Sequence, residues 1–140
     1  MKPLVKWSGG KRKEIKLFRH HYPDNFSTFV EPFLGGGAVY FDLNFEGKSV
    51  ISDTHEELIN FYTQVKKPEN CRKIHRMMNN PWFHLFRGKQ VKENMGEIYN
   101  SLPSGFQNTG ELTYYYVRDE FVPKNKVEEA FQFYFLRKTA

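Results

Sequence analysis

The sequence has little of what secreted, membrane-spanning or metal-binding proteins need. Its single cysteine, Cys71, excludes an internal disulfide and a zinc site made of several cysteines. The five histidines lie at no spacing that would hold a metal together with nearby Asp or Glu, so we expect no metal. No apolar run approaches the roughly 18 residues of a membrane-spanning helix, and no apolar signal region follows the first residues. These absences predict a cytoplasmic protein without a membrane partner.

The chain does have enough apolar material for a core, and its charges are segregated. Of its 140 residues 39% are hydrophobic and 17% aromatic, and the net charge is +5. Residues 1–20 carry seven Lys or Arg and residues 66–92 carry eight, with one acid in each, whereas residues 21–65 carry one lysine and seven acids. This pattern is typical of a polyanion-binding face beside a ligand pocket, although a solvated basic surface would give it too.

A glycine-rich turn is the most informative stretch. Residues 29–40 read FVEPFLGGGAVY, in which an apolar strand runs into three glycines and then into an apolar segment with helical spacing. Glycines at such a junction let a small molecule lie against the backbone and leave helix N-terminal N–H groups free to bind it. The alternative, a turn that merely reverses the chain, is favoured if the glycines are taken alone.

An acidic residue further along changes that balance. Residues 49–52 read as a second short strand, and Asp53 follows it, 18 residues after Gly35. In doubly wound sheets an acid at the tip of the second strand accepts hydrogen bonds from ribose hydroxyls. The dinucleotide fingerprint would need glycine where this chain has Tyr40, so a nicotinamide-dependent oxidoreductase is disfavoured. The pattern predicts an adenosine-bearing ligand without a diphosphate, and S-adenosylmethionine fits.

Helical spacing predicts most of the remaining elements. We expect helices over residues 11–22, 38–43, 56–65, 69–78 and 112–121, and a last, buried helix from about residue 125. Residues 102–110 are polar and turn-rich, which is typical of a loop. The pattern becomes basic and mixed after residue 66, so we place a domain boundary near residue 67.

Basic and aromatic residues alternate beyond that boundary. The aromatic residues Trp82, Phe83 and Phe86 stand among several cations, a mixture suited to phosphate contacts and base stacking. The alternative is that these aromatic residues belong to a core. The cations are Arg72, Lys73, Arg76, Arg87, Lys89 and Lys92.

Four segments in a fixed order carry a resemblance to a known family. They are KWSGGK (residues 6–11), FVEPFLGGGAV (residues 29–39), Ser52-Asp53 followed by Leu58-Ile59, and YYVRDEF (residues 115–121). With them the chain resembles the Dam-type, D12 class of DNA adenine-N6 methyltransferases over nearly its whole length, least from residue 66 to 110. The resemblance implies an α/β fold: a partial Rossmann-like methyltransferase sheet with an appended, mostly helical target-recognition segment.

The resemblance also implies roles for parts of the chain and for single residues. Residues 1–66 would bind S-adenosylmethionine, and residues 67–140 would recognise double-stranded DNA. Within KWSGGK, Trp7 suits stacking on an adenine-like ring and Lys11 suits a carboxylate, unless Trp7 is an ordinary buried residue beside a turn. The resemblance implies cofactor contacts for Trp7, Lys11, Glu31, Gly35, Gly36, Gly37 and Asp53, and a place close to the DNA for Lys6. We also expect DNA contacts at Arg72, Lys73, Arg76, Arg87, Lys89 and Arg118.

One motif of the family is missing. Its members transfer methyl with a D-P-P-Y motif, whose Asp and a proline carbonyl accept hydrogen bonds from the target amine while the Tyr stacks on the flipped adenine. None of the seven prolines here is adjacent to another, so we assign no catalytic residue. We expect the N-terminal portion of a site-specific DNA adenine methyltransferase, partnered by a C-terminal continuation or second chain that carries D-P-P-Y. The alternative is a catalytically inactive nucleic-acid-binding module that keeps the fold.

Overall fold

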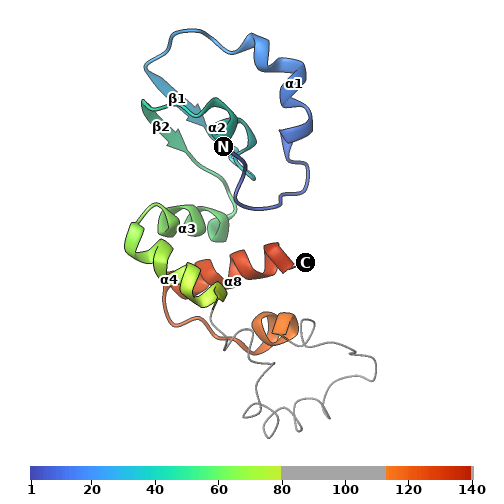
Figure 1. Cartoon of the computed structure of the whole chain (residues 1–140), viewed down its shortest axis with the longest axis vertical. Coiled ribbons are helices and arrows are strands. Elements are labelled where there is room, and N and C mark those ends of the chain that lie inside the picture. The colour runs from blue at the N-terminus through green and yellow to red at the C-terminus, as the bar shows by residue number, and fades with distance from the viewer. Residues whose placement is uncertain (80–112, 140) are drawn as a thin grey trace, which may run out of the picture. The chain divides into compact units, whose positions relative to one another are not determined.

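The chain divides into two units, Met1–Ile59 and Asn60–Ala140 (Figure 1). The computed structural model describes residues 1–79 and 113–139. The loop expected at residues 102–110 and the aromatic residues expected near residue 83 lie outside this part. Among the described helices, none has the length and apolar character that crossing a membrane requires. The two functional domains expected on either side of residue 67 stay a prediction.

The first unit contains a parallel two-stranded sheet. Strands β1 (Thr28–Glu31) and β2 (Lys48–Ile51) pair from Thr28 opposite Lys48 to Glu31 opposite Ile51 (Figure 1). The chain crosses from one to the other through helix α2 (Ala38–Leu43). Backbone hydrogen bonds continue beyond the strands, because Ser52 N donates to Glu31 O and Leu34 N donates to Ser52 O, both at 2.9 Å. The carboxyl ends of the strands are thereby held side by side, and the fold is mixed α/β, as predicted.

Helix α2 begins and ends at residues in the left-handed backbone conformation. Gly37 precedes it with φ of 70°, and Asn44 follows it with φ of 47°. A Cβ on Gly37 would lie 3.0 Å from the Phe41 ring, so glycine is required there both by its φ and by the close packing of Phe41. Phe41 and Ala38 are the buried residues of the helix. The predicted bounds of this helix are confirmed.

The single helix predicted over residues 11–22 is wrong. The segment is broken into a 3-10 turn (Lys11–Lys13), the short helix α1 (Ile15–Phe18) and a second 3-10 turn (Arg19–His21). Ile15 is its one buried residue, and Leu17 is 73% exposed. So small a buried surface does little to stabilise a continuous helix. Arg19 instead ties the segment to α2 through paired hydrogen bonds to the Asp42 carboxylate.

The second unit is helical and has an aromatic core. Its elements are the main part of α3 (Glu56–Val65), α4 (Pro68–Asn79), the π-helical turn η4 (Tyr116–Glu120) and α8 (Lys126–Thr139). The Phe61 ring stacks on Tyr134 with centroids 5.0 Å apart, and Phe131 is fully buried. The bounds predicted for α3 and the burial predicted for the last helix are confirmed.

Side-chain amides fix the ends of the helices in this unit. Asn125 Oδ1 accepts hydrogen bonds from the N–H groups of Val127 and Glu128, which satisfies the first turn of α8. Gln132 Nε2 donates to Val117 O at 2.8 Å and to Phe121 O at 3.1 Å. One α-helix was predicted over residues 112–121, whereas Tyr116–Glu120 form a π-helical turn. The Gln132 amide binds one carbonyl within that turn and one directly after it.

Candidate functional site

A pocket opens at the carboxyl ends of β1 and β2. It has a volume of about 260 Å³ and lies within the first unit. Three segments line it: residues 7–11 of KWSGGK, residues from Glu31 through the glycine turn to Val39, and Asp53 after β2. Of the seven residues for which cofactor contacts were predicted, six lie on its wall. Gly37 is absent from this wall and lies buried beside Phe41.

The Asp53 carboxylate joins the glycine turn to the segment after β2. Its Oδ2 accepts a hydrogen bond from Gly35 N at 2.8 Å, and its Oδ1 accepts one from His55 N at 3.0 Å. These hydrogen bonds, first that from Gly35 and then that from His55, lower the pKa of Asp53. The side chain is therefore anionic and held in one orientation at the pocket wall, and each oxygen retains a lone pair for a ligand hydroxyl.

Trp7 packs directly against the glycine turn. A Cβ on Gly35 would lie 3.1 Å from Trp7 Cδ1, and one on Gly36 would lie 3.0 Å from Trp7 Cβ. Gly35 also has φ of 50°, which favours glycine. Two of the three glycines thus make room for an indole of the same chain. The ordinary interpretation of Trp7, a partly buried residue beside a turn, describes its position in this structure, and the indole still lines the pocket.

The expectation that the turn presents free N–H groups is wrong for two of its glycines. Gly35 N donates to Asp53, and Gly37 N donates to Leu34 O at 2.8 Å. Helix α2 has six residues, so its dipole is small. These two N–H groups are therefore not free to bind an anionic group of a ligand.

Glu31 brings a second carboxylate to the pocket wall, at the end of β1. Its Oε2 is buried and has no hydrogen-bond partner among the described residues. Burial raises the pKa of Glu31, and a hydrogen bond from the Tyr40 backbone opposes that rise in part. A buried carboxylate oxygen without a partner is costly, and this one can accept a hydrogen bond from a molecule in the pocket.

Lys11 lies at the mouth of the pocket and has a partner in the chain. Its Nζ lies 3.2 Å from a carboxylate oxygen of Glu14, and 60% of the lysine side chain is exposed. Exposed pairs of this kind contribute little to stability. A ligand carboxylate could therefore replace Glu14 at small cost.

The residues predicted to bind DNA are distributed over both units. Lys6 is exposed in the first unit, and Arg72, Lys73 and Arg76 are exposed along α4. Arg118 in η4 is paired with Asp119 and lies over the Tyr115 ring at 4.4 Å, so its guanidinium already has contacts within the chain. The remaining two, Arg87 and Lys89, lie outside the described residues.

One contact in the site was not predicted from the sequence. The His55 and Trp7 rings meet with centroids 5.1 Å apart at an angle of 79°. No local pattern indicates a contact between residues so far apart in the chain.

The search for a metal site covers the described residues. Within residues 1–79 and 113–139, no three His, Cys, Asp or Glu residues lie close enough together to hold an ion.

The sequence of this chain matches the D12 class of N6 adenine-specific DNA methyltransferases over residues 7–140. It belongs to that family. The match includes every segment that lines the pocket, and it leaves out the first six residues of the chain. The family predicted from the four sequence segments is thus confirmed.

Relatives of the chain come from a virus, an archaeon and bacteria. It is 38% identical over 99% of its length to the type II methyltransferase M.CviBI of Paramecium bursaria Chlorella virus NC1A, of which it covers 43%. It is 32% identical over 99% of its length to the type II methyltransferase M.MjaIII of Methanocaldococcus jannaschii, of which it covers 46%. It is 35% identical over 79% of its length to a DNA adenine methylase of Vibrio cholerae, of which the match covers 36%. The chain spans less than half the length of these relatives.

The Asp53 hydrogen bonds generate a pH-dependent prediction. A lowered pKa in the folded state stabilises the fold above the ordinary pKa of Asp, and this stabilisation is lost as the pH falls through the lowered value. Asp53→Asn should therefore lower the free energy of unfolding by about 1–2 kcal/mol at neutral pH, because a neutral amide oxygen accepts more weakly than a carboxylate. The difference from the wild type should shrink on acidification. Urea denaturation at neutral and acidic pH measures it.

Asp24→Asn is the matched control, since Asp24 is exposed in the segment before β1. It should change stability little at either pH. A loss for Asp53→Asn that is the same at both pH values would contradict the role given to the charge.

Proposed function

We propose that this chain is the S-adenosylmethionine-binding portion of a methyltransferase that acts on adenine N6 in DNA, together with part of its DNA-binding surface. The observation that carries the proposal is the convergence of three groups at the strand ends. They are the anionic Asp53 carboxylate, the unpaired oxygen of Glu31 and the Trp7 indole. Membership of the D12 class supports the same conclusion.

The chemistry of the pocket matches the chemistry of this cofactor. S-adenosylmethionine, which supplies a methyl group on a sulfonium, carries ribose hydroxyls, an ammonium, a carboxylate and an adenine ring. Asp53 can accept from hydroxyls, the free oxygen of Glu31 can accept from an ammonium, and Lys11 can bind a carboxylate. The Trp7 ring offers an apolar wall for the remaining part. A nicotinamide dinucleotide would also need donors for its pyrophosphate, and the N–H groups of Gly35 and Gly37 are already used.

Methyl transfer needs groups that this chain does not supply. The target amine must be held by hydrogen-bond acceptors in line with the methyl group, and the chain contains no D-P-P-Y. The sheet also suggests a further part of the fold. Val30 and Val50 stand opposite each other in the register and are 60% and 46% exposed, whereas parallel sheets are usually covered on both faces. We infer that a polypeptide carrying D-P-P-Y completes the enzyme.

The α4 helix is the proposed DNA-binding surface within the described residues. Arg72, Lys73 and Arg76 are exposed on it, and Arg72 and Arg76 are one helical turn apart. The opposite face of the helix is anchored in the unit by the buried residue Ile74. Cations fixed on a helix in this way can contact successive phosphates of a duplex. A binding module without catalysis would use the same surface, so the experiments below separate the two functions.

Cofactor binding is tested by calorimetric titration with S-adenosylmethionine. Asp53→Ala should weaken binding by about 1–3 kcal/mol, because the ribose hydroxyls lose a charged acceptor. Glu31→Gln should weaken binding by a similar amount. Glu31→Gln should nevertheless stabilise the free protein at neutral pH. The pKa of Glu31 is raised in the folded state, so the fold loses stability as the pH rises and this carboxyl ionises, and glutamine does not ionise.

The control is Glu46→Gln, at an exposed position between α2 and β2. Neither its affinity nor its stability should differ from the wild type. Unchanged affinity in both the Asp53 and Glu31 variants would contradict the assignment of the pocket as the cofactor site. Binding of NADH as strong as that of S-adenosylmethionine would favour an oxidoreductase.

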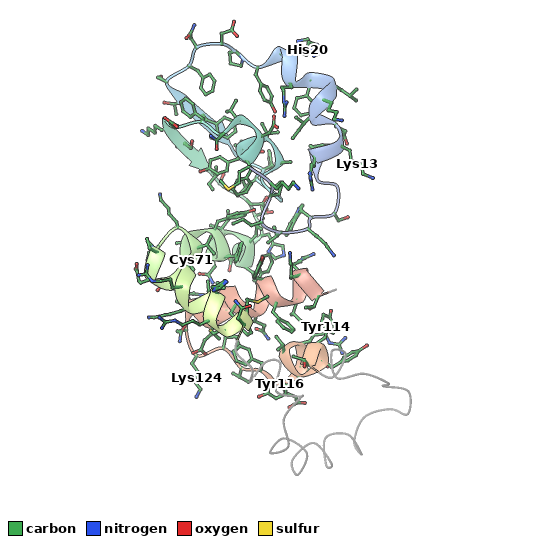
Figure 2. The ribbon with its side chains drawn as sticks, in the orientation of Figure 1. Lys13, His20, Cys71, Tyr114, Tyr116 and Lys124 are labelled. Carbon is green, nitrogen blue, oxygen red and sulfur yellow. The ribbon has the colours of Figure 1, made fainter. Side chains whose placement is uncertain are left out.

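DNA binding is tested by its dependence on salt. Cys71 is the single cysteine, exposed on α4 (Figure 2), so a fluorophore attached there reports binding of a duplex. Reversal of the charges at Arg72, Lys73 and Arg76 should reduce the slope of log affinity against log salt by about 2–3, since each phosphate contact contributes roughly 0.9. The control reverses Arg12, Lys13 and Lys16, which changes the net charge equally. Equal slopes for the two variants would mean that only net charge matters.

Catalysis is tested by adding the part of the enzyme that the chain lacks. The 140 residues alone should transfer no labelled methyl group to an adenine-containing duplex, because no group here positions the amine. A D-P-P-Y-bearing polypeptide, fused or added as a second chain, should restore transfer, and the same polypeptide with its Asp changed to Ala should not. Turnover by the chain alone would show that the acceptors are misplaced in this proposal. No turnover with the added part would favour the binding module.

A further inference from the structure

A histidine outside the pocket wall is linked to two of the groups that form it. The His55 backbone N–H donates to Asp53, and the His55 ring meets the Trp7 ring edge-to-face with centroids 5.1 Å apart. His55 itself is absent from the residues that line the pocket. Its contacts with Asp53 and Trp7 link it to the pocket wall.

The contacts that link His55, Asp53, Gly35 and Trp7 form a closed cycle. Gly35 N donates to the Asp53 carboxylate, which also accepts from His55 N. The His55 ring contacts the Trp7 ring, and Trp7 lies so near Gly35 that a Cβ there would be 3.1 Å from Trp7 Cδ1. The indole is thus held between the glycine turn and the imidazole. An edge-to-face pair of aromatic rings has a preferred geometry, so it restricts the orientation of the indole as well as its distance.

The His55 ring also has contacts at the start of α3, where its Nε2 lies 3.9 Å from a carboxylate oxygen of Glu57. The His55 Nδ1 accepts a hydrogen bond from Leu58 N at 3.4 Å, in the manner of a helix-capping side chain. The ring contact and the capping contact use different properties of the side chain, its aromatic surface and its acceptor nitrogen. Substitutions can therefore separate them.

We propose that His55 is a positioning residue, whose aromatic ring fixes the Trp7 indole against the glycine turn and so sets the shape of the pocket wall. As far as a ligand is concerned, this inference rests on the proposed cofactor function. The position of the indole is a property of the free protein and is measured without a ligand. Failure of this inference and failure of the cofactor assignment are therefore distinguishable.

The experiment uses the full chain with Trp82→Phe, which leaves Trp7 as its one tryptophan. His55→Asn keeps an oxygen that can cap α3 but removes the ring, and His55→Phe keeps a ring but removes the cap. Near-ultraviolet circular dichroism and fluorescence emission report the indole environment, and S-adenosylmethionine titration reports the pocket. His20→Asn is the control, because His20 is exposed in the same unit (Figure 2).

His55→Asn should lose the dichroic band of Trp7, shift its emission to the red and weaken cofactor binding by about three- to tenfold. His55→Phe should keep the indole signals and bind within about twofold of the parent. An unchanged indole signal in His55→Asn would overturn the proposal, and so would equal losses in both variants, which would assign His55 to capping alone. If the parent binds no S-adenosylmethionine, the cofactor assignment fails while the indole signals still decide the role of His55.

Discussion

The structure of the pocket depends on one carboxylate that accepts two backbone hydrogen bonds. Asp53 follows β2, while Gly35 lies in the turn after β1, so the hydrogen bond between them closes the site across the ends of both strands. The hydrogen bond from His55 fixes the other oxygen and leads the chain into α3. Because both donors are main-chain groups, the arrangement depends on the path of the backbone, and that path requires glycine at position 35, where φ is 50°.

The sequence predicted those features that depend on local pattern. The bounds of α2 and α3 follow from apolar spacing and from residues that stop a helix, and both are confirmed. The helix expected over residues 11–22 has the same spacing, but Ile15 alone is buried, and periodicity does not reveal how much surface a helix will cover. Tertiary context likewise decided the role of the glycines. From the sequence we expected the space left by their missing Cβ atoms to hold a ligand. In the structure Gly35 and Gly36 also accommodate Trp7, which is distant in the chain.

The two carboxylates of the pocket differ in what they contribute to the fold. Asp53 is satisfied by backbone donors, its pKa is lowered, and ionisation stabilises the folded state. Glu31 has a buried oxygen without a partner in the described chain, its pKa is raised, and ionisation destabilises the folded state. Under the proposed function both carboxylates bind the cofactor, so the opposite pKa shifts describe their opposite effects on the free fold and not separate roles in binding.

The groups proposed to bind the cofactor all lie within the first 53 residues, whereas the groups that would orient the target amine are absent from the chain. Binding of the cofactor and transfer of its methyl group require different arrangements of side chains. A cofactor can be bound by a turn, two strand ends and one indole, all within one unit of the chain, but in-line transfer requires acceptors on the far side of the methyl group. Val30 and Val50 stand opposite each other in the register and are exposed, whereas parallel sheets are usually covered on both faces. Under the proposed function, a segment that packed over both valines and carried acceptors to the same strand ends would cover the sheet and complete the active site together.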